Sequence, residues 1–84
     1  MPVLMEKRIG TVIILIESPG QVDRLNGIIS SHSDLVLGRQ GIPLREKQLN
    51  IISLVLEGTT DEIGSLTGKL GRLDGIKVRS VLAN

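Results

Sequence analysis

Cysteine, aromatic residues and long apolar runs are what this sequence lacks. Without cysteine in its 84 residues, the chain has neither a disulfide framework nor a thiolate metal site. Without Phe, Tyr or Trp, it has no platform on which nucleic-acid bases could stack. The longest apolar runs span about five residues, against the ~20 that a membrane-spanning helix needs. We therefore expect no membrane association.

The charge of the chain argues against a large phosphate-binding surface. The formal net charge is only +1, and basic residues alternate with acidic ones. Direct nucleic-acid binding is therefore not expected. The segment 1–8 lacks the apolar core and small-residue cleavage site of a secretory signal, so we expect a cytoplasmic protein. We expect a solvated rim from six basic residues: Arg39, Arg45, Lys69, Arg72, Lys77 and Arg79.

Two segments, 12–16 and 51–56, are apolar at every position except Ser53. Side chains alternate between the faces of a sheet, so a strand with one covered face needs only every second residue to be apolar. Both segments should therefore be central strands of a sheet that is buried on both faces. The alternation does not say which face meets the helices. We predict that the other face is buried between subunits, and we assign this interface to Ile13, Leu15, Ile51 and Val55.

The first strand, expected over residues 9–17, leads into the first helix. Ser18 has the character of an N-cap, with Pro19 at the first helical position and Gln21 at the capping-box position. The helix should bury a stripe and end near residues 30–33. A second strand is expected over 35–42, where two glycines suit a bent or bulged edge strand. The predicted buried stripe consists of Val22, Leu25, Ile28 and Ile29.

The third strand, expected over about 48–57, is followed by a second capped helix. Residues 59–62 form a capping box with acidic residues near the helix N-terminus. Gly75 is the expected C-terminal cap. The last strand, 76–82, alternates polar and apolar residues, as an edge strand does. The predicted buried stripe of this helix consists of Ile63, Leu66, Leu70 and Leu73.

The order βαββαβ predicts an α+β, ferredoxin-like sandwich with a four-stranded antiparallel sheet and two helices on one face. The first and third strands are central in that fold, and these are the doubly apolar ones. We expect a single domain over residues 9–84, preceded by an N-terminal extension at 1–8. A chain of this length buries only about 60–65% of its unfolded surface. We therefore expect a homo-oligomer, either a dimer or a tetramer.

Several stretches of the sequence resemble a known family. Residues 17–26, which begin Glu-Ser-Pro-Gly-Gln, resemble the strand-to-helix junction of ACT domains, small modules that commonly sense amino acids. Residues 41–46, 63–71 and 75–78 extend the likeness. Over about 5–82 the chain is similar to a small ACT-like family of iron-only hydrogenase system regulators, which are classed as transcriptional regulators. The resemblance implies a non-enzymatic regulatory domain without a cofactor.

Three features are candidates for a binding site. Ser18, Gly20, Gln21 and Val22 surround a helix N-terminus, where backbone N–H groups suit a small anionic effector, although helix capping alone also explains these residues. Glycines 64, 68 and 71 lie on one side of the second helix and predict close approach of another backbone, either a ligand or partner helix or the chain's own sheet. His32 is the single histidine, and we expect it to be solvated and to bind no metal.

No paired carboxylates, activated nucleophile or phosphate loop stands out, so catalysis is not expected. The sequence favours a regulatory or sensor module that works through oligomerisation and through binding a small effector or a protein partner. The alternative is a structural or protein-interaction subunit with no small-molecule ligand.

Overall fold

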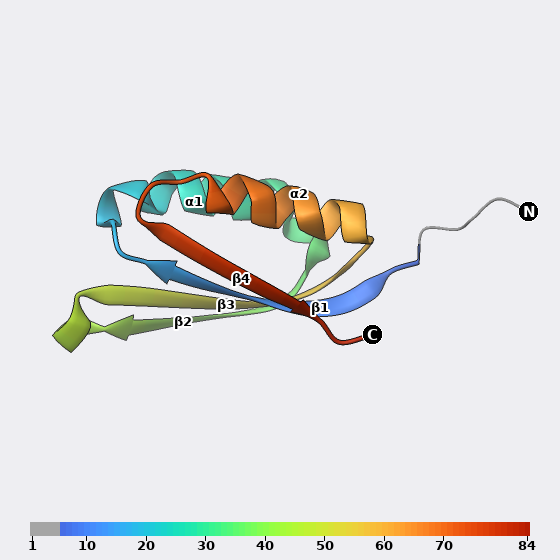
Figure 1. Cartoon of the computed structure of the whole chain (residues 1–84), viewed down its shortest axis with the longest axis horizontal. Coiled ribbons are helices and arrows are strands. Elements are labelled where there is room, and N and C mark those ends of the chain that lie inside the picture. Colours follow the sequence, from blue (N-terminus) through green and yellow to red (C-terminus); the bar gives the residue numbers. More distant parts are fainter. Residues whose placement is uncertain (1–5) are drawn as a thin grey trace, which may run out of the picture.

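The computed structural model describes residues 6–84, which form a layer of two helices on a four-stranded sheet (Figure 1). β1 begins at Arg8, and residues 1–5 of the predicted N-terminal extension lie outside the described residues. The strands are β1 (Arg8–Ile16), β2 (Val36–Leu44), β3 (Leu49–Gly58) and β4 (Ile76–Leu82). The helices are α1 (Val22–Ser31) and α2 (Thr60–Gly71), and short 3-10 turns cover Pro19–Gln21, Ser33–Leu35 and Arg45–Lys47.

The sheet confirms the predicted placement of the doubly apolar strands. Its order is β2-β3-β1-β4 with every neighbouring pair antiparallel, so β1 and β3 are central. Both helices lie on one face of this sheet (Figure 1). β2 is an edge strand, as expected, and its register with β3 shifts at a bulge between Val36 and Gly38.

The helix-facing side of the sheet forms the core. Val12 and Ile14 of β1 are completely buried, and on β3 Leu54 lies directly opposite Val12. Even-numbered positions of these two strands therefore meet the helices, which settles the question that alternation left open. The buried residues of the helices complete a single apolar cluster: Leu25, Ile29, Ile63, Leu66 and Leu70.

The start of α2 has the predicted capping box. The Glu62 amide donates to Thr59 Oγ1 at 3.1 Å, and the Thr59 amide donates to Glu62 Oε1 at 2.8 Å. The prediction for the other end of α2 was wrong. The helix is capped at Arg72, while Gly75 lies beyond it, in the turn that leads into β4, with φ of 74°. Gly75 thus serves the turn and not the helix end.

Of the two explanations for the α2 glycines, close packing against the chain's own sheet is wrong. A β-carbon built at Gly64, Gly68 or Gly71 has no neighbouring atom within 4 Å outside the local helix backbone. All three are exposed, because the buried stripe of α2 points toward the sheet and they lie on its outer side. Contact of these glycines with a ligand or a partner helix stays a prediction.

No helix within residues 6–84 is long and apolar enough to cross a membrane.

Candidate functional site

The face of the sheet opposite the helices is an exposed apolar surface, which we call the open face. The four residues predicted to form an interface all lie on it. Leu15 of β1 stands directly opposite Ile51 of β3, and both are half-buried. Ile13 of β1 is 45% exposed. Val55 of β3, which pairs with Thr11, is 43% exposed. Side chains this apolar and this exposed, gathered on one face, mark a surface suited to contact with another protein.

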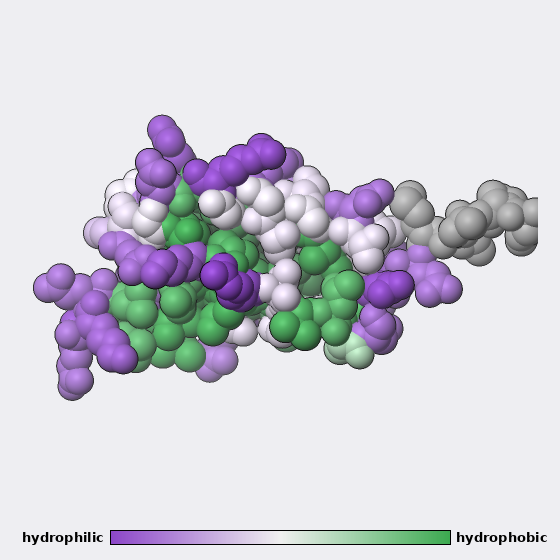
Figure 2. Space-filling view, viewed as in Figure 1, coloured by the Kyte–Doolittle hydropathy of each residue, from purple (hydrophilic) through white to green (hydrophobic). Residues whose placement is uncertain are grey.

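The apolar surface extends further than the sequence predicted. Ile42 of β2 pairs with Ile51, and Val81 of β4 pairs with Thr11, so both lie on the open face. Val81 is 66% exposed, and Ile9 at the start of β1 is exposed as well. Val81 lies outside the apolar alternation of β4, whose positions 76, 78 and 82 pair with the even-numbered side of β1, so that alternation does not indicate it. Figure 2 shows hydrophobic side chains reaching the surface on the sheet side, below the mostly polar helices.

A cationic margin borders the open face along β4. Lys77 stands directly opposite Leu15, and Arg79 directly opposite Ile13. Lys77 Nζ lies 3.6 Å from Glu17 Oε1, whereas Arg79 Nη1 donates to the carbonyl of its own neighbour, Val78, at 2.8 Å. The side chains of Ile13, Leu15, Lys77 and Arg79 line a hollow of about 170 Å³.

The predicted effector residues lie together at the junction between β1 and α1, but the capping expected there is absent. Pro19–Gln21 is a 3-10 turn, α1 begins only at Val22, and the Ser18 side chain makes no capping hydrogen bond. The Gln21 amide donates to the Ser18 carbonyl at 3.1 Å, and the Val22 amide donates to the Pro19 carbonyl. Two of the N–H groups expected to face an anion are therefore engaged within the turn.

Ser18 has a different partner from the one predicted. Its side chain packs against Gly75, where a β-carbon would overlap it, and the neighbouring Glu17 amide donates to the Gly75 carbonyl at 2.8 Å. These contacts join the end of β1 to the start of β4. Residues so distant in the sequence give no local signal of such a contact.

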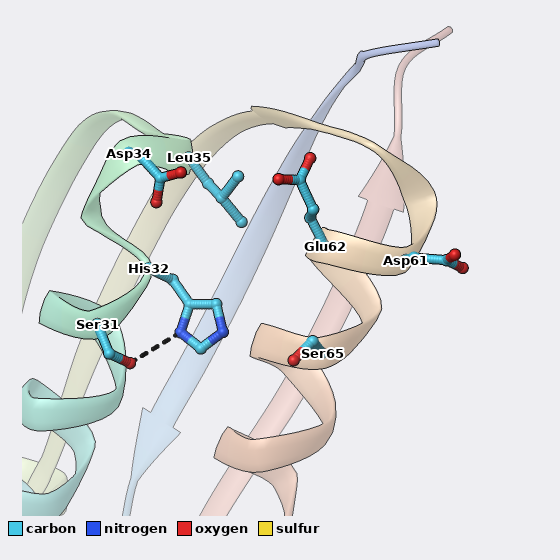
Figure 3. Close-up of a pocket in the computed structure, with 7 residues that line it drawn as sticks. All are labelled: Ser31, His32, Asp34, Leu35, Asp61, Glu62 and Ser65. Atoms are coloured by element: carbon cyan, nitrogen blue, oxygen red, sulfur yellow. Dashed lines mark hydrogen bonds between the residues drawn. The ribbon is translucent and has the colours of Figure 1, made fainter. Parts of the chain in front are cut away.

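His32 lies in a cleft between the end of α1 and the start of α2 (Figure 3). Its Nδ1 is 2.9 Å from the Ile28 carbonyl oxygen and 3.0 Å from Ser31 Oγ. Glu62, on the opposite wall, is held by its capping bond to Thr59, which lowers the pKa of that carboxyl. Within residues 6–84 no group of three or more His, Asp or Glu side chains is arranged to hold a metal ion. The cleft has a volume of about 390 Å³.

Both the sequence and the fold of the chain match those of known proteins. Residues 8–80 match the model of a family described as "TM1266-like: Iron-only hydrogenase system regulator, putative". The uncharacterized protein TM1266 from Thermotoga maritima is 35% identical and has a TM-score of 0.90, with 94% of this chain and all of that one covered. No curated protein matches the sequence.

A more distant structure shares the fold alone. The C-terminal domain of MgtC from Mycobacterium tuberculosis is 13% identical with a TM-score of 0.71, covering 90% of this chain and 87% of that domain.

Proposed function

This chain belongs to the TM1266-like family of iron-only hydrogenase system regulators, and we propose that it regulates by associating with itself through the open face of its sheet. The observation that carries the proposal is the apolar surface of Ile13, Leu15, Ile51 and Val55, which the rest of the described chain covers only in part. The βαββαβ order with β1 and β3 central supports the ferredoxin-like, ACT-like assignment.

The occupant that best fits the open face is a second copy of the chain. Four strands spaced about 4.8 Å apart and about 30 Å long present a flat area of roughly 600 Å². The accessible surface of such a face is larger than its flat area, and a stable interface buries about 800 Å² on each partner. Two sheets packed face to face would bury both apolar surfaces at a spacing of about 10 Å.

Regulation would follow from the assembly. A net charge of +1 offers few phosphate contacts, so the module would act on transcription through contacts with other proteins and not by binding DNA on its own. An effector or protein partner that binds one assembly state better than another shifts the population toward that state. No catalytic step is needed in this scheme, and the chain acts as a binding module.

A small anionic effector at Ser18, Gly20, Gln21 and Val22 is a second proposal. What favours it is the open space above Gly20, where a β-carbon would meet no atom within 4 Å. Since Gln21 and Val22 already donate within the turn, a neighbouring subunit must supply most of the contacts. Gly20→Val should then abolish effector binding and leave the assembly intact.

Sedimentation equilibrium of the purified chain at micromolar concentration tests self-association. We expect a dimer or tetramer for the wild type and a folded monomer for Ile13→Lys, because a buried, unpaired ammonium group is strongly unfavourable. Ile13 is 45% exposed in the single chain, so Lys at this position is compatible with folding. Ser65→Lys adds the same charge to the helix layer and should leave the assembly unchanged. A wild type that stays monomeric whatever ligand is added would refute the proposal.

A further inference from the structure

We infer that the hollow between β1 and β4 on the open face binds a short apolar carboxylate, and that the second copy of the chain closes over it. This inference rests on the proposed self-association and adds a ligand to that same surface. The site is formed by Ile13, Leu15, Lys77 and Arg79, and it is separate from the junction at Ser18–Val22.

The hollow combines an apolar wall with two cations in a fixed arrangement. Antiparallel pairing places Arg79 directly across from Ile13 and Lys77 directly across from Leu15. Each apolar side chain therefore has a cationic neighbour on the same face. A ligand with an apolar tail and an anionic head fits this pattern, since its tail contacts β1 while its head lies at β4.

The two cations are short of negative partners. They stand two residues apart on the same side of β4, with Cα atoms about 7 Å apart, so two like charges are placed on one short stretch of the strand. Lys77 has Glu17 at 3.6 Å, and both side chains of this pair are largely exposed. Arg79 forms no ion pair with any of residues 6–84, and one of its guanidinium nitrogens reaches only the Val78 carbonyl. A carboxylate accepts two parallel hydrogen bonds from a guanidinium group.

The same charges disfavour an amino acid as the ligand. A free ammonium group would lie beside Lys77 and Arg79, and the carboxylate that these cations have within residues 6–84, that of Glu17, already faces Lys77. The size of the hollow, about 170 Å³, limits the ligand as well. The charges and the size of the hollow together favour a short apolar acid without an amine.

A single chain cannot enclose such a ligand, because only four side chains line the hollow and it opens on the exposed face. A second sheet packed about 10 Å away would form its roof and exclude water from the ion pair. Binding would therefore be coupled to association, and the ligand would strengthen the assembly by mass action.

The test uses 3-methylbutanoate as the probe, with 3-methylbutanamide and leucine as matched controls. The melting temperature and the sedimentation-derived association constant are measured at several probe concentrations. We expect 3-methylbutanoate to raise both and the two controls to raise neither. Arg79→Gln should weaken the response by about tenfold or more, as loss of a charge-assisted hydrogen bond does. Arg72→Gln, an exposed change in the helix layer, should leave the response unchanged.

The possible outcomes distinguish this inference from the proposal of self-association on which it rests. If the wild type is an oligomer and 3-methylbutanoate changes neither its melting temperature nor its association constant, the inferred ligand is wrong and the proposal of self-association stands. A monomer with and without the probe overturns both. A monomer that associates only when the probe is added supports the ligand. If Arg79→Gln dissociates the ligand-free oligomer, the partner of Arg79 is a carboxylate of the second copy, and the inference of a small-molecule site is wrong.

Discussion

Gly75 lies so close to Ser18 that a β-carbon at position 75 would overlap the Ser18 side chain. Gly75 also has a φ of 74°, in the left-handed region that glycine adopts without strain. The turn before β4 can therefore pack closely on the end of β1 only because residue 75 has no side chain. The Glu17 amide also donates a hydrogen bond of 2.8 Å to the Gly75 carbonyl.

Gly75→Ala should therefore lower the free energy of unfolding by about 2 kcal/mol or more, through backbone strain together with the overlap. Urea denaturation measures the change. The double variant Ser18→Gly, Gly75→Ala removes the overlap and keeps the strain, so it should recover part of the loss. Equal stability of wild type and Gly75→Ala would show that the turn tolerates a side chain.

Gly68→Ala should have the opposite effect. The position faces open space on the outer side of α2, so alanine gains helix propensity and meets no atom. We expect the free energy of unfolding to rise by about 0.5–1 kcal/mol in the same urea experiment. Destabilisation would mean that another molecule packs on the glycine side of α2 in solution.

Acid should weaken the N-terminal end of α2 through Glu62. The backbone hydrogen bond from Thr59 lowers the pKa of this carboxyl, with the Thr59 side chain as a second cause. Because the pKa is lower in the folded state, the contribution is present above the unfolded value of about 4.3 and is lost as pH falls through the folded pKa. Glu62→Gln should lower the melting temperature at pH 7 and have a smaller effect at pH 3.

Thr59→Ala gives a second variant of the same cap. It keeps the backbone donor of Thr59 and removes the hydroxyl that accepts from the Glu62 amide. Stability should fall by about 1 kcal/mol, and the dependence on pH should persist in reduced form. A Glu62→Gln protein that melts like the wild type at both pH values would contradict the assigned role of the carboxylate.

Val55→Thr should weaken self-association without affecting the single chain. Val55 is 43% exposed on the open face, so an isosteric hydroxyl is solvated in the monomer. In a sheet-to-sheet interface that hydroxyl loses its water, at about 1–3 kcal/mol when no acceptor is near. Sedimentation should show an association constant at least about fivefold lower, with an unchanged circular dichroism spectrum. Unaltered association would place Val55 outside the interface.

The sequence by itself determined the order of elements, the central position of β1 and β3, and the capping box at Thr59. These features depend on neighbours within a few residues: alternation along one strand, or a side chain that reaches the amide three positions away. Only the tertiary structure decided which side of β1 meets the helices, because both faces of this strand are apolar and the alternation does not distinguish the face of Ile13 from that of Ile14.

The tertiary structure also decided the roles of residues whose contacts are distant in the sequence. Ser18 contacts Gly75 and does not cap α1, the α2 glycines face outward, and Arg79 comes to stand beside Ile13. The glycines face outward because the apolar stripe of α2 packs on the sheet. The other two contacts follow from the register of strands far apart in the chain, and register is set by how the apolar faces of the strands pack together.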